Sequence, residues 1–65
     1  MKELSDFIHS SVCVTTYCDN VYHGTLLAVD QYLNVVLQSV LKDNNEKKGF
    51  IFIKGSNILL LNLLQ

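Results

Sequence analysis

The 65-residue sequence contains no proline, only two cysteines, few charges and no long hydrophobic run. Cys13 and Cys18 are five positions apart, so on one strand they would point to opposite faces, which argues against a local disulfide. Neither these cysteines nor His9 and His23 have the spacing of a zinc site, so we expect no metal. Apolar runs reach only four residues, as in Ile58–Leu61, far below the ~20 residues of a membrane-spanning helix. Without proline, repeats or low-complexity segments, the chain offers no linker between domains.

Charge is nearly balanced, with 5 basic residues against 6 acidic residues and a net charge of −1. This excludes a protein that binds nucleic acid through bulk electrostatics, although a small site repeated by oligomerisation remains open. The N-terminal MKELSDF lacks the apolar stretch of ~7–15 residues that a signal peptide requires. Together with the expectation of free thiols, this predicts an intracellular, reducing location.

Apolar residues are what the sequence has in abundance: 49% of the chain is hydrophobic and the mean hydropathy is +0.26. A chain of this length forms one domain at most, predicted to span residues 1–65. Folding alone, it would bury only ~60% of the surface that its unfolded form exposes. Too much apolar surface in too small a volume indicates a subunit of an assembly.

The periodicity predicts one short helix followed by five strands. Leu4, Phe7 and Ile8 form the apolar stripe of an amphipathic helix at about 2–10. Alternating β-branched and aromatic residues, interrupted by turn formers and by the charged loop 42–48, predict the strands. Their expected ranges are 12–17, 21–29, 34–41, 49–53 and 57–63. Short connections without a crossover favour a mainly β fold, with a bent antiparallel sheet that forms a small barrel. Gly24 falls inside the second strand, where it indicates a sharp bend or a close backbone approach.

The last two strands are apolar on both faces. The residues concerned are Phe50, Ile51, Phe52, Ile53, Ile58, Leu59, Leu60 and Leu61. An edge strand of this kind would aggregate in a monomer, and pairing with a neighbouring chain removes the hazard. Head-to-tail pairing of unlike edges closes a ring. The alternative is that both strands lie in the centre of the subunit's own sheet.

A polar group, Asp30, Gln31, Tyr32 and Asn34, interrupts the apolar stretch from Gly24 to Leu37. Taken singly, Asp30 and Asn34 are ordinary turn formers, and Tyr32 is an ordinary loop tyrosine. Later in the chain, Lys54, Gly55 and Ser56 follow Ile53 and are predicted to form a tight turn.

Jointly, these two segments resemble the two motifs of the Sm and Sm-like (Lsm) family. GTL followed by VDQYLNVVL has the glycine of a bent strand and then Asp-x-aromatic-apolar-Asn, while IKGS has an aliphatic residue, a basic residue, glycine and a small polar residue. The resemblance covers nearly the whole chain. Within the family, GTL, VDQYLN and FIKGS are most similar to the second eukaryotic Lsm paralogue.

The resemblance implies an Sm fold: an N-terminal helix on a strongly bent five-stranded antiparallel sheet, which is an SH3-like small barrel. It implies a ring of paralogues, commonly seven in eukaryotes, in which the fourth strand of one subunit pairs with the fifth of the next. The ring would bind single-stranded uridine-rich RNA in its pore. For the second paralogue, the implied roles are holding the 3′ end of U6 spliceosomal RNA in the nucleus and the 3′ end of messenger RNA during decapping and decay in the cytoplasm.

The resemblance also assigns roles to the site residues. Tyr32 would stack on a base, and Asn34 would hydrogen-bond to uracil. Asp30 would order the loop, and Lys54 would lie over the other face of the base or near phosphate. Gly55 would permit the turn, and Ser56 follows it as part of the same RNA-binding motif. Lys54 stands where most members carry arginine, so the planar surface that stacks on a base is lost here.

Two other functions remain open. One is a purely structural ring member with little RNA contact, which the lysine substitution keeps in view. The other is a peptide-binding SH3-like barrel, disfavoured because Phe7, Phe50 and Phe52 are expected at core positions rather than in a groove. No nucleophile–base pair, metal cluster or phosphate-binding glycine loop is visible, so we expect no enzyme, no cofactor and no small-molecule substrate.

Overall fold

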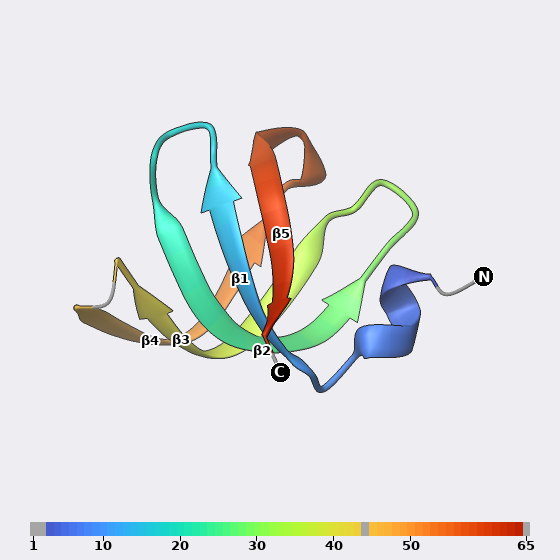
Figure 1. Ribbon diagram of the computed structural model, residues 1–65, viewed down its shortest axis with the longest axis horizontal. Helices are drawn as coiled ribbons and strands as arrows, with labels where there is room; N and C mark the ends of the chain where they lie inside the picture. The colour runs from blue at the N-terminus through green and yellow to red at the C-terminus, as the bar shows by residue number, and fades with distance from the viewer. Residues whose placement is uncertain (1–2, 44, 65) are drawn as a thin grey trace.

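The chain forms a single antiparallel sheet whose strands bend strongly, as the computed structural model shows for residues 3–43 and 45–64 (Figure 1). The mainly β class predicted from the sequence is confirmed. Residue 2 of the predicted helix and residue 44 of the predicted loop lie outside the described residues, as do the two ends of the predicted domain, residues 1 and 65. The strands are β1 (Ser11–Thr16), β2 (Val21–Val29), β3 (Val35–Lys42), β4 (Glu46–Ile53) and β5 (Ile58–Leu64).

The strand order is β4-β3-β2-β1-β5, so β4 and β5 are the two edges of the sheet. Each neighbouring pair is antiparallel. The alternative in which both strands are central is therefore wrong. Both edge strands present backbone donors and acceptors on their outer sides, along which another chain can pair.

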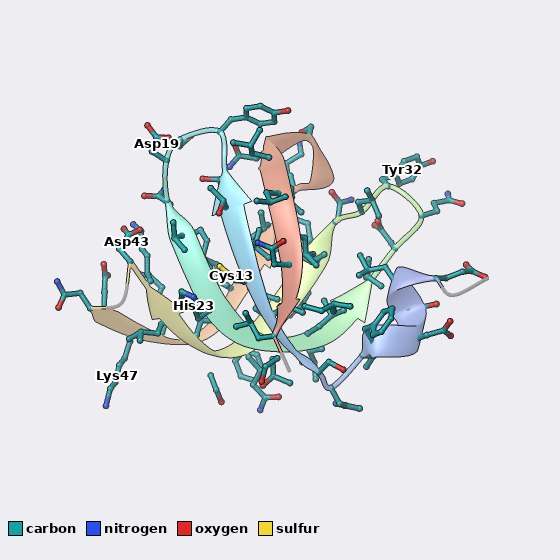
Figure 2. The ribbon with its side chains drawn as sticks, viewed as in Figure 1. Cys13, Asp19, His23, Tyr32, Asp43 and Lys47 are labelled. Atoms are coloured by element: carbon teal, nitrogen blue, oxygen red, sulfur yellow. The ribbon has the colours of Figure 1, made fainter. Side chains whose placement is uncertain are left out.

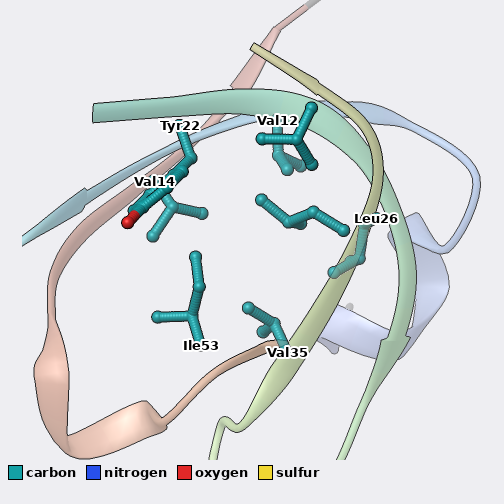
Figure 3. Close-up of a cluster of buried hydrophobic side chains, with 8 residues drawn as sticks. Val12, Val14, Tyr22, Leu26, Val35 and Ile53 are labelled. Carbon is teal, nitrogen blue, oxygen red and sulfur yellow. The ribbon is translucent and has the colours of Figure 1, made fainter. Parts of the chain in front are cut away.

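The core lies on the concave side of the bent sheet (Figure 3). In β1, Val12, Val14 and Thr16 are buried, while Cys13 and Thr15 between them are only half-buried, which is the period of two expected for a strand. The other buried side chains are Tyr22, Leu26, Val35, Leu37, Val40 and Ile53. These residues come from β1 to β4. The fifth strand, β5, contributes the partly buried Ile58 and Leu61, which pack against the same cluster.

Gly24 lies where β2 passes closest to β3. A Cβ atom at this position would lie 3.0 Å from the carbonyl oxygen of Gln38 and 3.1 Å from Cγ2 of Val40. The β2–β3 register also shifts between His23 and Thr25. Glycine therefore permits the close approach that accompanies the bend.

The predicted N-terminal helix is shorter than expected. A single 3-10 turn, η1 (Leu4–Phe7), replaces it. Ile8 is already extended, and His9 adopts a φ of 77° and donates its N–H to the carbonyl oxygen of Leu26 at 2.6 Å. The sheet thus ends the helix early, although Leu4, Phe7 and Ile8 still pack against the core.

The fourth strand begins earlier than expected, at Glu46, so part of the predicted charged loop pairs with β3. Along β4, Ile53 is buried and Ile51 is half-buried, while Phe50 and Phe52 are 64% and 60% exposed. The expectation that Phe50 and Phe52 occupy core positions is wrong, because their face of this edge strand is not covered by the chain itself. None of the helical segments that the structure describes is long and apolar enough to span a membrane.

Candidate nucleic-acid interface

The β2–β3 loop (residues 30–34) is held by the carboxylate of Asp30. Oδ1 accepts hydrogen bonds from the backbone N–H groups of Tyr32 at 2.8 Å and Asn34 at 3.0 Å. Oδ2 accepts one from Nδ2 of Asn34 at 2.9 Å. These are the loop-ordering hydrogen bonds expected of Asp30, because a short acidic side chain readily bonds to the backbone of its own turn.

The same hydrogen bonds lower the pKa of Asp30 below its ordinary value of 3.8, with the Asn34 side chain as the largest cause. They favour the charged carboxylate, since a carboxylate accepts more hydrogen bonds than a carboxylic acid does. The loop is therefore held together by an ionised group at neutral pH.

Asn34 joins this loop to the segment after β4. Its Oδ1 accepts a hydrogen bond of 2.7 Å from the backbone N–H of Gly55, while its Nδ2 faces Asp30. These partners fix which end of the amide is oxygen and which is nitrogen. One Nδ2 hydrogen and one Oδ1 lone pair are left, so the side chain can still offer one donor and one acceptor to a ligand.

Gly55 allows the two segments to touch. It begins a second 3-10 turn, η2 (Gly55–Asn57). A Cβ atom at Gly55 would collide with the carbonyl oxygen of Tyr32 and would lie 2.9 Å from the carbonyl carbon of Leu33. Because these atoms are backbone, no side-chain movement can relieve the collision. The glycine is therefore needed for packing against the β2–β3 loop.

Tyr32 projects from the tip of this loop, with 71% of its surface exposed (Figure 2). Leu33 beside it is 53% exposed and has a φ of 64°, a conformation that a leucine adopts at a cost. The hydrogen bonds of Asp30 hold this conformation, since the N–H of Leu33 also donates to the Asp30 carbonyl oxygen at 3.1 Å. An exposed aromatic ring on a fixed loop can stack on a nucleobase.

Lys54 and Ser56 flank Gly55 and are both exposed. Lys54 is the extended residue before η2, and both side chains line a hollow of about 460 Å³ between the end of β4 and the β1–β2 turn. The structure thus brings together the segments of all six predicted RNA-binding residues, and contact of these residues with RNA stays a prediction.

The predicted interface residues divide by burial. Phe50, Phe52, Leu59 and Leu60 are exposed, whereas Ile53 is only 4% exposed and belongs to the subunit's own core. The remaining members, Ile51, Ile58 and Leu61, are half-buried. Leu63 and Leu64 are exposed on β5 and were missed, although the apolar sequence LNLL continues to them.

Sequence reasoning also missed the β1–β2 turn (residues 17–20), which contacts η2 through a hydrogen bond of 3.0 Å from the N–H of Tyr17 to the carbonyl oxygen of Asn57. No motif marks it, and only the fold brings it to the site. Cys13 and Cys18 are free. No group of three or more histidine, cysteine or acidic side chains that could hold a metal occurs in the described part of the chain.

Comparison with known proteins places the chain among relatives. The LSM domain family model matches residues 2–63. The chain is 35% identical over 63 residues to the U6 snRNA-associated Sm-like protein LSm6 of Debaryomyces hansenii, covering 91% of this chain and 74% of that protein. It is also 35% identical over 65 residues to the LSm6 of Lodderomyces elongisporus, covering 94% and 81%.

Solved structures of Sm-like proteins have the same fold as this chain. A Sm-like archaeal protein from Pyrobaculum aerophilum matches with a TM-score of 0.91 and 31% identity over 95% of this chain, which spans about half (48%) of that longer protein. A heptameric archaeal Sm protein matches with a TM-score of 0.87 and 28% identity, covering 95% of this chain and 96% of that one. The Pyrococcus abyssii Sm protein in complex with a uridine heptamer matches with a TM-score of 0.84 and 25% identity, covering 97% and 100%.

The family predicted from the sequence is thereby confirmed, although both curated relatives bear the name of a different paralogue from the one predicted. The match of the family model to residues 2–63 and the shared five-stranded sheet lead to one conclusion. The chain belongs to the LSM-domain family of Sm and Sm-like proteins.

Proposed function

We propose that this chain is a non-catalytic, RNA-binding subunit of a ring of Sm-like subunits, and that it holds one nucleotide of a single-stranded, uridine-rich RNA. The observation that carries the proposal is the bridge from Asp30 through Asn34 to Gly55, which ties the two motif loops together. This bridge presents the exposed Tyr32 ring from a fixed loop beside the Lys54 segment.

The chemistry of these groups suits uracil. Tyr32 supplies an aromatic face for stacking, which every base can use. Asn34 retains one donor and one acceptor, which match the alternating acceptor and donor groups on the edge of uracil. Lys54 supplies a positive charge for a neighbouring phosphate. Asp30 does not contact the RNA in this proposal, because its carboxylate would repel phosphate and is already occupied within the loop.

The ring follows from the two unlike sheet edges. β4 and β5 lie at opposite ends of the strand order, and both carry exposed apolar side chains. Pairing β4 of one subunit with β5 of the next covers these side chains and satisfies the backbone groups of both edges. A similar archaeal protein is a heptamer, which supports extending this assembly to the present chain.

The RNA partner is inferred from relatives. The curated relatives are named as U6 snRNA-associated, and a similar archaeal protein was solved with a uridine heptamer. On this basis, the ring holds the uridine-rich 3′ end of U6 snRNA in the nucleus, and a related ring holds messenger RNA ends during decapping and decay in the cytoplasm. Sequencing the RNA ends that co-purify with the tagged chain tests this, and the absence of both RNA classes would contradict it.

The direct test is Tyr32→Ala in the assembled ring. We expect oligouridine binding to weaken by ~1–3 kcal/mol, the cost of losing one base–aromatic stack. Fluorescence anisotropy with labelled oligouridine measures it, and native mass spectrometry checks that the ring is intact. Gln31→Ala is the matched control, because Gln31 is exposed in the same loop and has no role in the proposal.

Asn34→Ala is a weaker test, because this side chain also joins the two loops and its loss would disturb both. Unchanged affinity of Tyr32→Ala would favour the alternative of a structural ring member that makes little contact with RNA.

A further inference from the structure

Three loops meet along one edge of the molecule. The β1–β2 turn, η2 and the β2–β3 loop all lie toward the top in Figure 1, where they connect the ends of neighbouring strands. The Tyr17 N–H donates to the Asn57 carbonyl oxygen at 3.0 Å, and the Cys18 thiol donates to Oδ1 of Asn57 at 3.8 Å. η2 is in turn bonded to the β2–β3 loop through Gly55 and Asn34. The β1–β2 turn is therefore part of the same connected edge as the proposed nucleotide site.

Tyr17 is exposed on this edge to almost the same degree as Tyr32, at 65% against 71%, whereas Tyr22 is only 8% exposed. Its turn is well ordered by its own hydrogen bonds. The N–H of Asn20 donates to Oγ1 of the buried Thr16 at 3.2 Å, and the N–H of Asp19 donates to the Thr16 carbonyl oxygen at 3.0 Å. An exposed ring on an ordered turn loses little conformational entropy when it binds.

A hollow of about 460 Å³ extends from this turn toward Lys54. Its lining includes Thr16 and Cys18, the two neighbours of Tyr17, together with Lys54, Ser56 and Asn57. The other lining residues are Tyr22 and three residues of β4 from the predicted subunit interface, Ile51, Phe52 and Ile53. The hollow therefore adjoins both the turn that carries Tyr17 and the segment proposed to hold the first nucleotide.

The charges favour a base over a phosphate at Tyr17. Asp19 is exposed on the same turn, as Figure 2 shows, and its carboxylate would repel a phosphate group. Stacking of a base on a tyrosine ring requires no positive charge, and Lys54 across the hollow can meet the phosphate. A contact with a neighbouring subunit is less favoured, because Tyr17 lies at a strand end and not along the β4 or β5 edge.

We propose that Tyr17 is a second base-stacking side chain, which takes a nucleobase next to the one at Tyr32 on the same RNA strand. The inference rests on the proposed function, since it assumes that single-stranded RNA reaches this edge. It also gives the subunit a second exposed aromatic surface beside Tyr32.

The chain contains no tryptophan, which makes a direct spectroscopic test possible. In Tyr17→Trp, the new indole is the only tryptophan of the chain, and we expect oligouridine to quench its emission when added to the assembled ring. Asn45→Trp is the control, because Asn45 is exposed on the β3–β4 hairpin, away from this edge (Figure 1). Its emission should not respond to oligouridine.

Affinity provides the second readout. Tyr17→Ala should weaken oligouridine binding by about fivefold or more, as expected for one lost stack. Tyr17→Phe should retain the affinity, since the ring and not the hydroxyl makes the contact. Full affinity of Tyr17→Ala, together with no quenching in Tyr17→Trp, would overturn the inference.

The outcomes separate this inference from the proposed function. If Tyr32→Ala weakens binding but the Tyr17 variants behave as wild type, the inference fails and the proposed function stands. If neither position responds, both fail. If the emission of Tyr17→Trp changes on ring assembly but not on addition of RNA, Tyr17 contacts a neighbouring subunit and the inference is wrong.

Discussion

The side chain of Asn34 forms hydrogen bonds with two separate segments of the chain. It gives a hydrogen bond to Asp30 within its own loop and accepts one from Gly55, 21 positions further along the chain. One amide therefore couples two motifs that are separate in sequence. A substitution in either motif is expected to disturb the other, so single variants at this site should not be additive.

Gly55→Ala should destabilise the fold, because the added Cβ would collide with backbone atoms of Tyr32 and Leu33. We expect a loss of ~1–3 kcal/mol in the free energy of unfolding, as for other overpacked sites. Urea unfolding at a fixed subunit concentration measures it. Gly49→Ala is the matched control, since a Cβ atom at Gly49 would meet nothing within 4 Å. Equal stability of the two variants would show that the loops do not pack as described.

Asp30→Asn should lose stability at neutral pH but not in acid. The pKa of Asp30 is lowered in the folded state, so its contribution is present above the ordinary value of 3.8 and disappears as the pH falls through the lower folded value. The difference in unfolding midpoint between wild type and variant should therefore shrink on acidification.

Glu46 also has a lowered pKa, caused mainly by its hydrogen bond with Lys48 and then by the charges of Lys48 and Lys42. Because both proteins contain Glu46, its titration cancels in the comparison. A difference in midpoint that stays constant from neutral pH to about pH 3 would contradict the role given to Asp30.

At the scale of single residues, the sequence predicted which side chains belong to the candidate site better than it predicted the hydrogen bonds between them. Asp30, Tyr32 and Asn34 stand out because polar residues interrupt an apolar stretch. The bond from Gly55 to Asn34 depends on how the sheet folds back, which no local pattern encodes. The position of Tyr17 beside η2 was not predictable for the same reason, since this contact arises only in three dimensions.

Among the elements, the edge strands carry the largest share of exposed apolar surface. Phe50 and Phe52 on β4 and Leu59, Leu60, Leu63 and Leu64 on β5 are all exposed. β5 is also without charge along its whole length. Edge strands that stay unpaired usually carry charges or proline that prevent pairing, and β5 carries neither.

Leu60→Lys should prevent ring formation, because it places a charge on the apolar edge where a neighbouring strand would pair. We expect native mass spectrometry to show a closed ring for the wild type and free subunits or open fragments for the variant. Gln38→Lys is the control, because Gln38 is exposed on β3, which already has a neighbour on each side. An intact ring containing Leu60→Lys would argue against assembly through β5.

The N-terminal turn shows where element prediction fails. The stripe of Leu4, Phe7 and Ile8 correctly identified which side chains face the core. Its length was overestimated, because the hydrogen bond from His9 to Leu26 draws the chain out of helical geometry. The start of β4 was predicted too late in a similar way, since pairing with β3 extends the strand back into charged residues, whereas its end at Ile53 was predicted correctly.

On the scale of the whole molecule, the chain has a small core and a large apolar surface. Eight buried hydrophobic residues form the core, while nine large hydrophobic side chains among the described residues are exposed. Composition alone indicated this imbalance, and the strand order explains it, because the exposed residues gather on the two edges and on the loops of the proposed RNA site. The fold class was therefore predictable from pattern and resemblance, whereas the division between core and edge required the structure.

The bend of β2 has a consequence for stoichiometry. β4 and β5 terminate one continuous ladder, so the angle between their outer sides is determined by the curvature accumulated across the strands between them. Gly24 lets β2 and β3 approach closely within this ladder, and the register between the two strands shifts there and again between Leu26 and Ala28. If subunits join edge to edge, each junction repeats this angle. The angle therefore determines how many subunits complete a closed ring. We therefore expect a larger residue at position 24, in the central strand of the sheet, to alter how many protomers complete the proposed ring.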